Sequence, residues 1–460
     1  MRRSRAIAAF GRNEGIDERL EAAGGSMAPV ILVTFAGRQK RMEILTEYVR
    51  RAMDLGIIDE WHLWDFTRSP EDHDWVTREF GPVRYMGSKA PYQLKGTVTP
   101  FSSFRTDAAI SNDLHIAVLP NDDPAHYFEI VVGGWNNKHS VVRKLPRSDL
   151  ESFERADTTP IWSRSTPGAL SPGVPNEVVL NLDAEGVPAL SVNGVAIGRW
   201  PELDWRSEAS VMVRGGWGAD LEFSDVTART RRYVGNPNET LPYWQAYDYY
   251  AKRLRDFSNA VFLKCDDDIV YLDVEKLDDF IEFRRTNPHY FVISANVVNN
   301  GVCAYLQQAA GSIPDAVGHF EHPPGGFGGS LWQSAERADR LHDFFLQADD
   351  KHLPLPTAVV EWRERQSINF IAWLGKDLVH MALPKGDDEH ALTVDLPTFL
   401  GRPTAIYSDF TVSHLSFGPQ ERGLDVDRLI HAYDALMRDR LHHKDEPAYP
   451  RLERMAASGR

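Results

Sequence analysis

Hydrophobic residues near the start of the chain follow two alternating periods, one typical of buried strands and one typical of helices. An uninterrupted β-rich apolar run predicts a strand over residues 29–35 that is buried on both faces. Apolar residues then recur on one helical face over residues 40–55, and Gly56 ends that segment. A second strand over 61–66 and a short helix over 71–80 follow. Strands and helices that alternate at this spacing predict βαβ units and a parallel sheet.

The pattern changes between residues 90 and 226, where no convincing helical period is found. Short β-rich segments alternate there with turn sequences, including Asn193-Gly194, a strong hairpin signal. Such a series predicts an antiparallel β-sandwich. The α/β pattern resumes with a helix over 243–256 and a buried strand over 259–265. We therefore expect the sandwich to be inserted into a surface loop of the α/β domain.

These patterns divide the chain into a polar N-terminal extension, a discontinuous α/β domain, an inserted sandwich and a tail. The four parts cover residues 1–26, 27–88 together with 229–445, 89–228, and 446–460. The expected fold class is α/β, a mostly parallel sheet flanked by helices and interrupted by a jelly-roll-like sandwich. Late in the α/β domain, the apolar residues 367–374 predict a helix, and short strands are expected over 404–407 and 411–416.

Composition and charge narrow the classes of function. The chain has 460 residues, a length that predicts two or three domains. The formal net charge of -15 argues against general nucleic-acid binding. The two cysteines, Cys265 and Cys303, are expected to be free thiols in a reducing compartment. No apolar run is long enough to span a bilayer or to form a signal peptide, so we expect a cytoplasmic protein with peripheral membrane contact left open.

Three consecutive aspartates, Asp266, Asp267 and Asp268, follow the buried strand. This carboxyl edge is where open α/β sheets bind ligands. Alternation along a strand turns Asp266 and Asp268 to one side, where two carboxylates favour a shared Mn²⁺ or Mg²⁺ ion that also binds a substrate diphosphate. Asp267 is turned away and is expected to tolerate replacement by Asn best. The structural alternative is a solvated acidic turn that caps the next helix.

The strand, the Asp-x-Asp motif and the N-terminal βαβ half together resemble glycosyltransferases of the GT-A fold, over residues 28–88 and 229–440. The resemblance implies that Asp266 and Asp268 contact the metal ion and the sugar nucleotide. Asp267 is then expected beside them in the donor site.

Two later residues gain a candidate role from the same resemblance. GT-A enzymes often add a late histidine to the metal ligands, and His414 is suitably placed in the sequence. The alternative is a structural histidine whose hydrogen bonds are satisfied within a strand. Phe327, flanked by four glycines, marks a loop that either closes over donor or acceptor or simply connects two elements.

The resemblance also places the nucleotide at the ends of the first two strands. Phe35 precedes Gly37, which lets backbone approach a ligand, and Arg38, which can bind phosphate. Asp65 resembles the acid that such folds direct at the base or ribose, and Arg422 is a candidate phosphate clamp. Ordinary loop or surface roles are the alternative for each residue.

An inverting transferase also needs a carboxylate that deprotonates the acceptor hydroxyl. Glu361 and Glu364 precede the predicted late helix and are the first candidates, while Asp387, Asp388 and Asp395 are further candidates. The Glu-Asp pair that is usual in this family is absent from that segment. Inverting and retaining chemistry therefore both stay open.

Residues 127–143 and 213–218 of the insertion resemble the farnesoic acid O-methyltransferase domain, and the resemblance covers residues 90–228. It implies a jelly-roll-like sandwich similar to lectin modules. Because no glycine-rich nucleotide loop occurs here within a βαβ unit, we do not predict methyl transfer. Trp135 and Trp217 are candidates for stacking on sugar rings, with core or turn packing as the alternative.

The leading hypothesis is a metal-dependent transferase that moves a sugar from a nucleotide-diphosphate sugar, with UDP favoured, to a glycan, a polysaccharide or another hydroxyl acceptor. One rival is a sugar nucleotidyltransferase, which also uses Mg²⁺ and carboxylates. The other rival is a non-catalytic glycan-binding protein whose α/β part is a scaffold. The donor sugar, the acceptor and the oligomeric state are left open.

Overall fold

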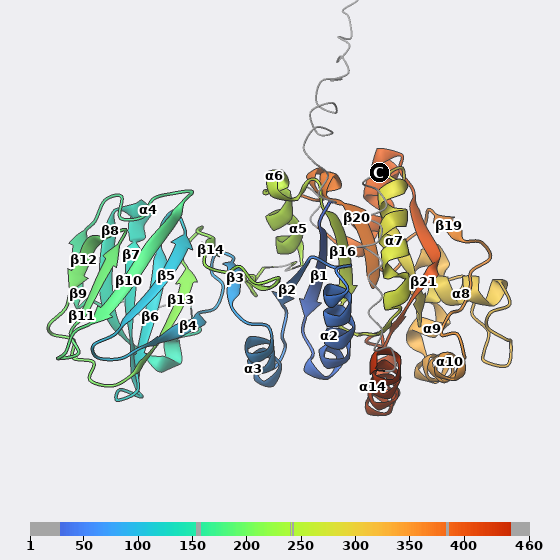
Figure 1. Ribbon diagram of the computed structural model, residues 1–460, viewed down its shortest axis with the longest axis horizontal. Helices are drawn as coiled ribbons and strands as arrows, with labels where there is room; N and C mark the ends of the chain where they lie inside the picture. The colour runs from blue at the N-terminus through green and yellow to red at the C-terminus, as the bar shows by residue number, and fades with distance from the viewer. Residues whose placement is uncertain (1–27, 153–157, 240, 242, 383–385, 443–460) are drawn as a thin grey trace, which may run out of the picture.

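The computed structural model describes residues 28–152, 158–239, 241, 243–382 and 386–442. The expected N-terminal extension over 1–26 and the tail over 446–460 lie outside these residues. Figure 1 shows an α/β body, in which helices cover both faces of a sheet, and a β-sandwich attached to one side of it. The expected fold class, an α/β sheet interrupted by an inserted antiparallel sandwich, is confirmed.

The strands of the α/β domain come from both sides of the insertion. They are β1 (Val30–Ala36), β2 (Glu60–Asp65), β3 (Val83–Met86), β15 (Thr230–Val234), β16 (Val261–Asp266), β17 (Ile269–Leu272), β18 (Ile293–Val298), β19 (Val359–Trp362), β20 (Phe370–Leu374) and β21 (Thr404–His414). The helices are α2 (Gln39–Asp54), α3 (Pro70–Glu79), α5 (Trp244–Ala251), α6 (Leu254–Phe257), α7 (Val274–Thr286), α8 (Gly301–Ala309), α9 (Gly329–Gln333), α10 (Ala335–Gln347), α11 (Leu378–Met381), α12 (Asp388–His390), α13 (Leu396–Leu400) and α14 (Val426–His442).

Parallel strands form the part of the sheet that carries the predicted site. The order β3-β15-β2-β1-β16 is parallel throughout, and the sheet continues through β20, β18, β21 and β17. Val30 and Leu32 of β1 pack into the core on one face, and Ile31 and Val33 pack into the core on the other. The strand is therefore buried on both faces, as its continuous apolar run predicts.

The insertion folds as two facing sheets around a core that also includes Val83 and Met86 of β3 and Val234 of β15. Its strands are β4 (Gln93–Val98), β5 (Ser103–Ala109), β6 (Leu114–Pro120), β7 (His126–Gly133), β8 (His139–Pro146), β9 (Trp162–Ser165), β10 (Pro175–Leu182), β11 (Pro188–Val192), β12 (Val195–Arg199), β13 (Ala209–Gly215) and β14 (Leu221–Phe223). One sheet has the order β4-β13-β6-β7-β8-β9. The other, β12-β11-β10-β5-β14, continues directly into the sheet of the α/β domain.

The two domains are joined at the edge where β14 pairs with β3. Glu222 of β14 lies opposite Tyr85 of β3 and also forms ion pairs with Arg84 at 2.9 Å and Arg253 at 3.1 Å. Arg253 comes from the turn between α5 and α6, on the far side of the insertion in sequence. One carboxylate thus connects the insertion to α/β segments that precede and follow it.

Two late elements differ from the expectations. Residues 367–374 were predicted to form a helix, but Phe370–Leu374 is strand β20, paired antiparallel with β16 and β18. A short apolar run is compatible with either structure, and this one is buried between two strands of the sheet. The strands predicted over 404–407 and 411–416 form a single strand, β21, whose register shifts between the pairs that it makes with Ala295 and Asn296.

Two smaller expectations agree with the structure. Cys265 and Cys303 are buried free thiols. None of the helices in the described part of the chain is both long and apolar enough to cross a bilayer.

Phe262 offers a test of the core that supports the site. Its fully buried ring stacks on Trp373, with centroids 5.4 Å apart, and contacts Tyr250. Phe262→Ala is expected to lower the free energy of unfolding by about 3–5 kcal/mol, since it leaves a cavity in a packed interior. Phe399, which is 82% exposed, is the control, and its replacement by Ala should change that free energy by about 0.5 kcal/mol or less. Urea denaturation measures both variants. Equal losses of unfolding free energy would contradict the packing of Phe262 described here.

Candidate functional site

The predicted donor-site residues meet at the carboxyl edge of three neighbouring parallel strands. In the register of the sheet, Phe35 of β1 lies opposite Asp266 of β16, and Ala36 lies opposite Asp65 of β2. Segments that are about 200 residues apart in the sequence are therefore adjacent here, as the βαβ pattern requires.

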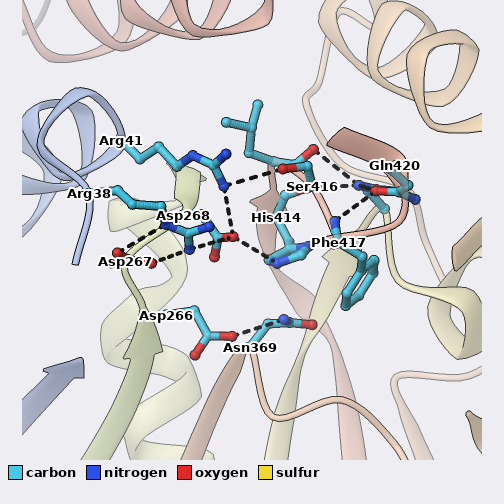
Figure 2. Close-up of polar contacts among 12 residues, drawn as sticks. Arg38, Arg41, Asp266, Asp267, Asp268, Asn369, His414, Ser416, Phe417 and Gln420 are labelled. Carbon is cyan, nitrogen blue, oxygen red and sulfur yellow. Dashed lines mark hydrogen bonds and ion pairs between the residues drawn. The ribbon is translucent and has the colours of Figure 1, made fainter. Parts of the chain in front are cut away.

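Asp266, Asp268 and His414 form a group that could hold a metal ion. One ligand atom from each lies within 4.8 Å of the others. Asp268 and His414 are buried, and His414 Nε2 lies 3.2 Å from Asp268 Oδ2 (Figure 2). Within the described residues, Asp268 Oδ1 and His414 Nδ1 are buried atoms without a hydrogen-bond partner. Two carboxylates and an imidazole with unsatisfied buried atoms are therefore suited to hold a metal ion.

The backbone brings His414 to Asp268 by strand pairing. His414 ends β21 and lies opposite Ile269 of β17, while the Leu415 N–H donates to the Asp268 carbonyl at 2.9 Å. The imidazole packs against the ring of Phe417, with centroids 4.4 Å apart. The late histidine is thus fixed beside the aspartates by backbone hydrogen bonds as well as by its side chain.

Asp266 is held from the opposite side of the group. Lys264, two residues earlier on the same strand, forms a short ion pair with it, and Asn369 Nδ2 donates to its Oδ2 at 3.0 Å. Lys264 is buried and also donates to the Ile368 carbonyl at 2.8 Å. The carboxylate of Asp266 therefore has a fixed orientation towards the group.

Asp267 does not belong to the group of Asp266, Asp268 and His414, but Arg38 Nη2 contacts both Asp267 and Asp268. Asp267 is buried, and its Oδ2 accepts hydrogen bonds from the Gly37 N–H at 2.9 Å and from Arg38 Nε at 3.2 Å. A Cβ on Gly37 would lie 3.1 Å from this carboxylate oxygen and 3.0 Å from the Phe66 carbonyl oxygen. The glycine therefore allows contact with Asp267, whereas the sequence suggested contact with a ligand.

Arg38 and Arg41, from the start of α2, neutralise the aspartates. Arg38 binds Asp267 and lies 3.0 Å from Asp268, and Arg41 contacts Asp268 at 3.3 Å and Glu421 at 2.7 Å (Figure 2). Burial alone would raise the pKa of Asp268, but His414 and the two arginines outweigh burial and hold that pKa well below its usual range. Asp268 is therefore ionised at neutral pH.

Sequence reasoning missed several residues of this network. Arg41 lies in the first turn of α2, three positions after Arg38, which precedes the helix in an extended conformation, so helical spacing did not indicate their shared role. Arg422 was a candidate phosphate clamp with an exposed surface role as the alternative; it is exposed, and its neighbour Glu421 reaches the site. Glu421 could not have been distinguished from other surface acids in the sequence.

Asp65 lines a separate cavity of about 240 Å³ beside the end of β2. Its buried carboxylate accepts from Thr67 Oγ1 at 2.7 Å and lies 3.2 Å from His73 Nδ1 and 3.4 Å from Arg232. Burial opposes ionisation, but these partners lower the pKa of Asp65. Gln93 and Asn236 also line the cavity and bring amide groups to it.

The two glutamates expected to act as bases are not placed together with the aspartates. Glu361 is on β19, which pairs with the start of β21, whereas His414 is at the other end of that strand. It forms an ion pair with Arg363, and Glu364 lies 3.5 Å from His322. The prediction that both glutamates precede a helix is wrong, because residues 370–374 form a strand.

Asp388, a further candidate base from the sequence, is electrostatically coupled to the site. Burial, together with the charge of Asp266, raises the pKa of Asp388, while Lys264 acts in the opposite direction. The Tyr247 hydroxyl donates to Asp388 Oδ2 at 3.3 Å. Asp387 and Asp395 have local roles instead, since Asp387 caps α12 and Asp395 contacts His390.

The glycine-flanked loop with Phe327 is attached to the same region. The guanidinium of Arg365 lies 3.9 Å above the Phe327 ring and forms ion pairs with Glu389 at 2.6 Å and Asp387 at 2.8 Å. Gly326 must remain glycine, since a Cβ there would lie 1.7 Å from the Arg365 carbonyl oxygen. The loop is thus joined to the acidic segment around α12.

In the insertion, Trp135 and Trp217 are exposed to 54% and 58%, which argues against core packing. Trp135 has a φ of 52°, in the left-handed region that a bulky residue rarely adopts. The turn is fixed by Asn137, whose side chain binds both the carbonyl and the N–H of Leu170.

The two tryptophan loops lie at the same end of the sandwich. Asp113 donates its N–H to the Gly133 carbonyl at 3.0 Å, and its own carbonyl accepts from the Gly216 N–H at 2.8 Å. One residue therefore links the loop of Trp135 with the loop of Trp217. Lys89 lies 4.2 Å above the Trp217 ring.

Comparison with known proteins gives a family match over the insertion. Residues 82–224 match the family model described as farnesoic acid O-methyl transferase. No curated protein matches the chain. All strand pairs from β4 to β14 in the described residues are antiparallel, so the matched region has no βαβ unit for a nucleotide.

Several solved structures are similar to part of the chain. The carbohydrate-binding module CBM66 from Bacillus subtilis is 11% identical, covers 33% of this chain and 94% of its own, and has a TM-score of 0.21. Galectin LEC-6 of Caenorhabditis elegans is 14% identical, with coverages of 29% and 93% and a TM-score of 0.20. β-Agarase A from Zobellia galactanivorans is 11% identical, with coverages of 29% and 59% and a TM-score of 0.18.

The contacts of Asp267 lead to a prediction opposite to the tolerance expected from the sequence. Asp267→Asn removes the charge that Arg38 pairs with and should lower the free energy of unfolding by about 2 kcal/mol. The control is Asp427→Asn, which breaks the exposed ion pair with Lys40 and should cost about 0.5 kcal/mol. Chemical denaturation measures both variants, and equal costs would show that Asp267 tolerates the replacement after all.

Proposed function

We propose that the α/β domain transfers a sugar from a nucleotide-diphosphate sugar, with a UDP-sugar favoured, to a hydroxyl of a glycan or another acceptor. The observation that carries the proposal is the group of Asp266, Asp268 and His414 at the carboxyl edge of the parallel strands. These residues would hold Mn²⁺ or Mg²⁺. When bound, the ion would supply positive charge to stabilise the departing diphosphate.

The surrounding residues support a rigid site. Asn299 donates to the carbonyls of His414 and Leu415 at 3.3 and 3.2 Å. His342 lies 2.9 Å from the Leu415 carbonyl, and burial lowers the pKa of His342 to about 4, so the neutral ring donates from Nε2. Through these bonds the end of β21 keeps the His414 imidazole directed at Asp268. Such support is typical of metal sites, in which outer residues orient the ligands.

Asp388 is the carboxylate that we assign as the acceptor base. Burial and the charge of Asp266 raise the pKa of Asp388, and a more basic carboxylate accepts a proton more readily. Tyr247 would orient it through their hydrogen bond. The amides and the carboxylate that line the cavity next to Asp65 would bind the nucleoside end of the donor.

A second function, glycan binding by the insertion, is supported by a separate observation. Trp135 and Trp217 are exposed on two loops that hydrogen bonds to Asp113 hold together. Exposed rigid aromatic rings provide flat apolar surfaces on which a sugar ring can stack. The insertion would serve the transferase by binding its acceptor, or act alone if the α/β domain is a scaffold.

Nucleotide-sugar binding is the direct test of the transferase proposal. A panel of UDP-, GDP-, CMP- and TDP-sugars is screened for thermal stabilisation, and one class should raise Tm by a few degrees only in the presence of Mn²⁺. Asp268→Asn and Asp268→Ala should abolish the Mn²⁺-dependent part, and should also abolish Mn²⁺-dependent hydrolysis of that donor. Asp409→Asn, an exposed acid elsewhere on β21, should leave both intact.

The outcomes separate the candidate functions. If no nucleotide sugar stabilises the protein with Mn²⁺, the transferase proposal is wrong and the non-catalytic function gains support. Stabilisation by a nucleoside triphosphate together with a sugar phosphate would favour the rival nucleotidyltransferase.

Glycan binding is tested separately on immobilised glycans and polysaccharides. Trp135→Ala and Trp217→Ala should each weaken binding about tenfold, since each removes an apolar stacking surface. Phe101→Ala is a matched control, because Phe101 is 83% exposed in the turn between β4 and β5 and also has a positive φ. If both tryptophan variants bind glycans as tightly as the wild type, the glycan site does not involve these two residues.

A further inference from the structure

One carboxylate oxygen at the site is shared by three nitrogen groups. Asp268 Oδ2 lies 3.0 Å from Arg38, 3.3 Å from Arg41 and 3.2 Å from His414. Asp268 Oδ1, by contrast, is a buried atom without a hydrogen-bond partner among the described residues. Positive charge is therefore already concentrated on the carboxylate that a metal ion would use.

The two arginines differ in their freedom to move. The Arg41 side chain is 8% exposed and is held by Ser416 Oγ at 3.2 Å and by Glu421 at 2.7 Å as well as by Asp268. The Arg38 side chain is 27% exposed, and both arginines line a cavity of about 670 Å³. Arg38 also binds Asp267 and lies 3.6 Å from Glu421, but its greater exposure at the cavity leaves it more room than Arg41 to adopt another rotamer.

A divalent ion at this group would place two positive charges beside the Arg38 guanidinium. In a largely buried site such repulsion is only weakly screened. An anionic group of the diphosphate type relieves it, because the anion attracts both the metal ion and the guanidinium. The cation and the anion should therefore each favour binding of the other.

We infer that Arg38 has two alternative partners, Asp268 and the diphosphate-type anion of the ligand, and that its move between them couples cation binding to anion binding. This inference rests on the proposed metal site at Asp266, Asp268 and His414. It makes Arg38 a positioning residue that suppresses binding of a metal ion alone. By linkage, the factor by which the anion strengthens cation binding equals the factor by which the cation strengthens anion binding.

Calorimetric titration with MnCl₂ alone tests the inference without measuring activity. Arg38→Met should bind Mn²⁺ about tenfold more tightly than the wild type, a typical size for such a coupling. Lys40→Met is the matched control on the same helix, because Lys40 pairs with the exposed Asp427 rather than with the aspartates. It should bind Mn²⁺ like the wild type.

Titration with UDP, with and without saturating Mn²⁺, measures the coupling itself. The wild type should bind UDP much more tightly with Mn²⁺ than without it, and this ratio should shrink about tenfold in Arg38→Met. Association of Mn²⁺ with UDP in solution is measured separately and subtracted. A ratio that is unchanged in Arg38→Met overturns the inference.

A second pair of variants keeps the test valid if Arg38→Met does not fold. Arg38→Met leaves the buried Asp267 without its main partner, so Arg38→Met/Asp267→Asn is compared with Asp267→Asn. The double variant should again bind Mn²⁺ more tightly than its reference.

The outcomes distinguish this inference from the proposed function. If the wild type binds Mn²⁺ and neither Arg38 variant binds it more tightly than its reference, the inference is wrong while the metal site stands. If neither the wild type nor any variant binds Mn²⁺, even with UDP present, the metal site fails and the inference fails with it.

Discussion

Compensation of the buried carboxylate of Asp268 is the constraint on which the site depends. A buried charge is costly unless it is paired, and Asp268 is paired by groups from α2 and from the end of β21. Its backbone carbonyl also accepts from Leu415. Two distant segments of the chain are thus tied to one residue, and loss of all three ion pairs would leave the Asp268 charge buried without a partner.

The residues that pair with Asp268 lie outside the region that matches a known family. The matched family covers residues 82–224 and includes none of the residues that contact Asp268. A fold that hosts many activities does not assign one, so the function of the α/β domain has to be argued from the site itself. There the decisive facts are the proximity of three potential metal ligands and the buried atoms that lack partners among the described residues.

The sequence predicted those features that depend on local pattern. The buried run over 29–35 and the helix after it are observed as β1 and α2, because strand and helix periods differ clearly in long segments. Asp266 and Asp268 were predicted from their position at the end of a strand, and His414 was predicted from the resemblance to GT-A enzymes. Glu361 was misplaced because its expected role depended on a helix that is in fact β20.

Features that depend on pairing across the fold could not be predicted in this way. The contact of Arg41 with Asp268 joins positions 227 residues apart, and that of Glu421 with Arg41 spans 380. Nothing in the sequence near either residue indicates its partner. The exposure of Trp135 was equally hidden, since it results from a left-handed turn that Asn137, two residues later, ties to Leu170 in a neighbouring loop.

The ion pairs of Glu222 at the junction of the two sheets have a consequence for how the domains work together. A module on a flexible linker samples a large volume, and the effective concentration of what it carries at a second site is diluted accordingly. Here the paired strands β14 and β3, locked by Arg84 and Arg253, replace such a linker with a continuous sheet. A saccharide held by the sandwich would be presented at one distance and in one orientation, so the acceptors served best would be those whose length matches that fixed span.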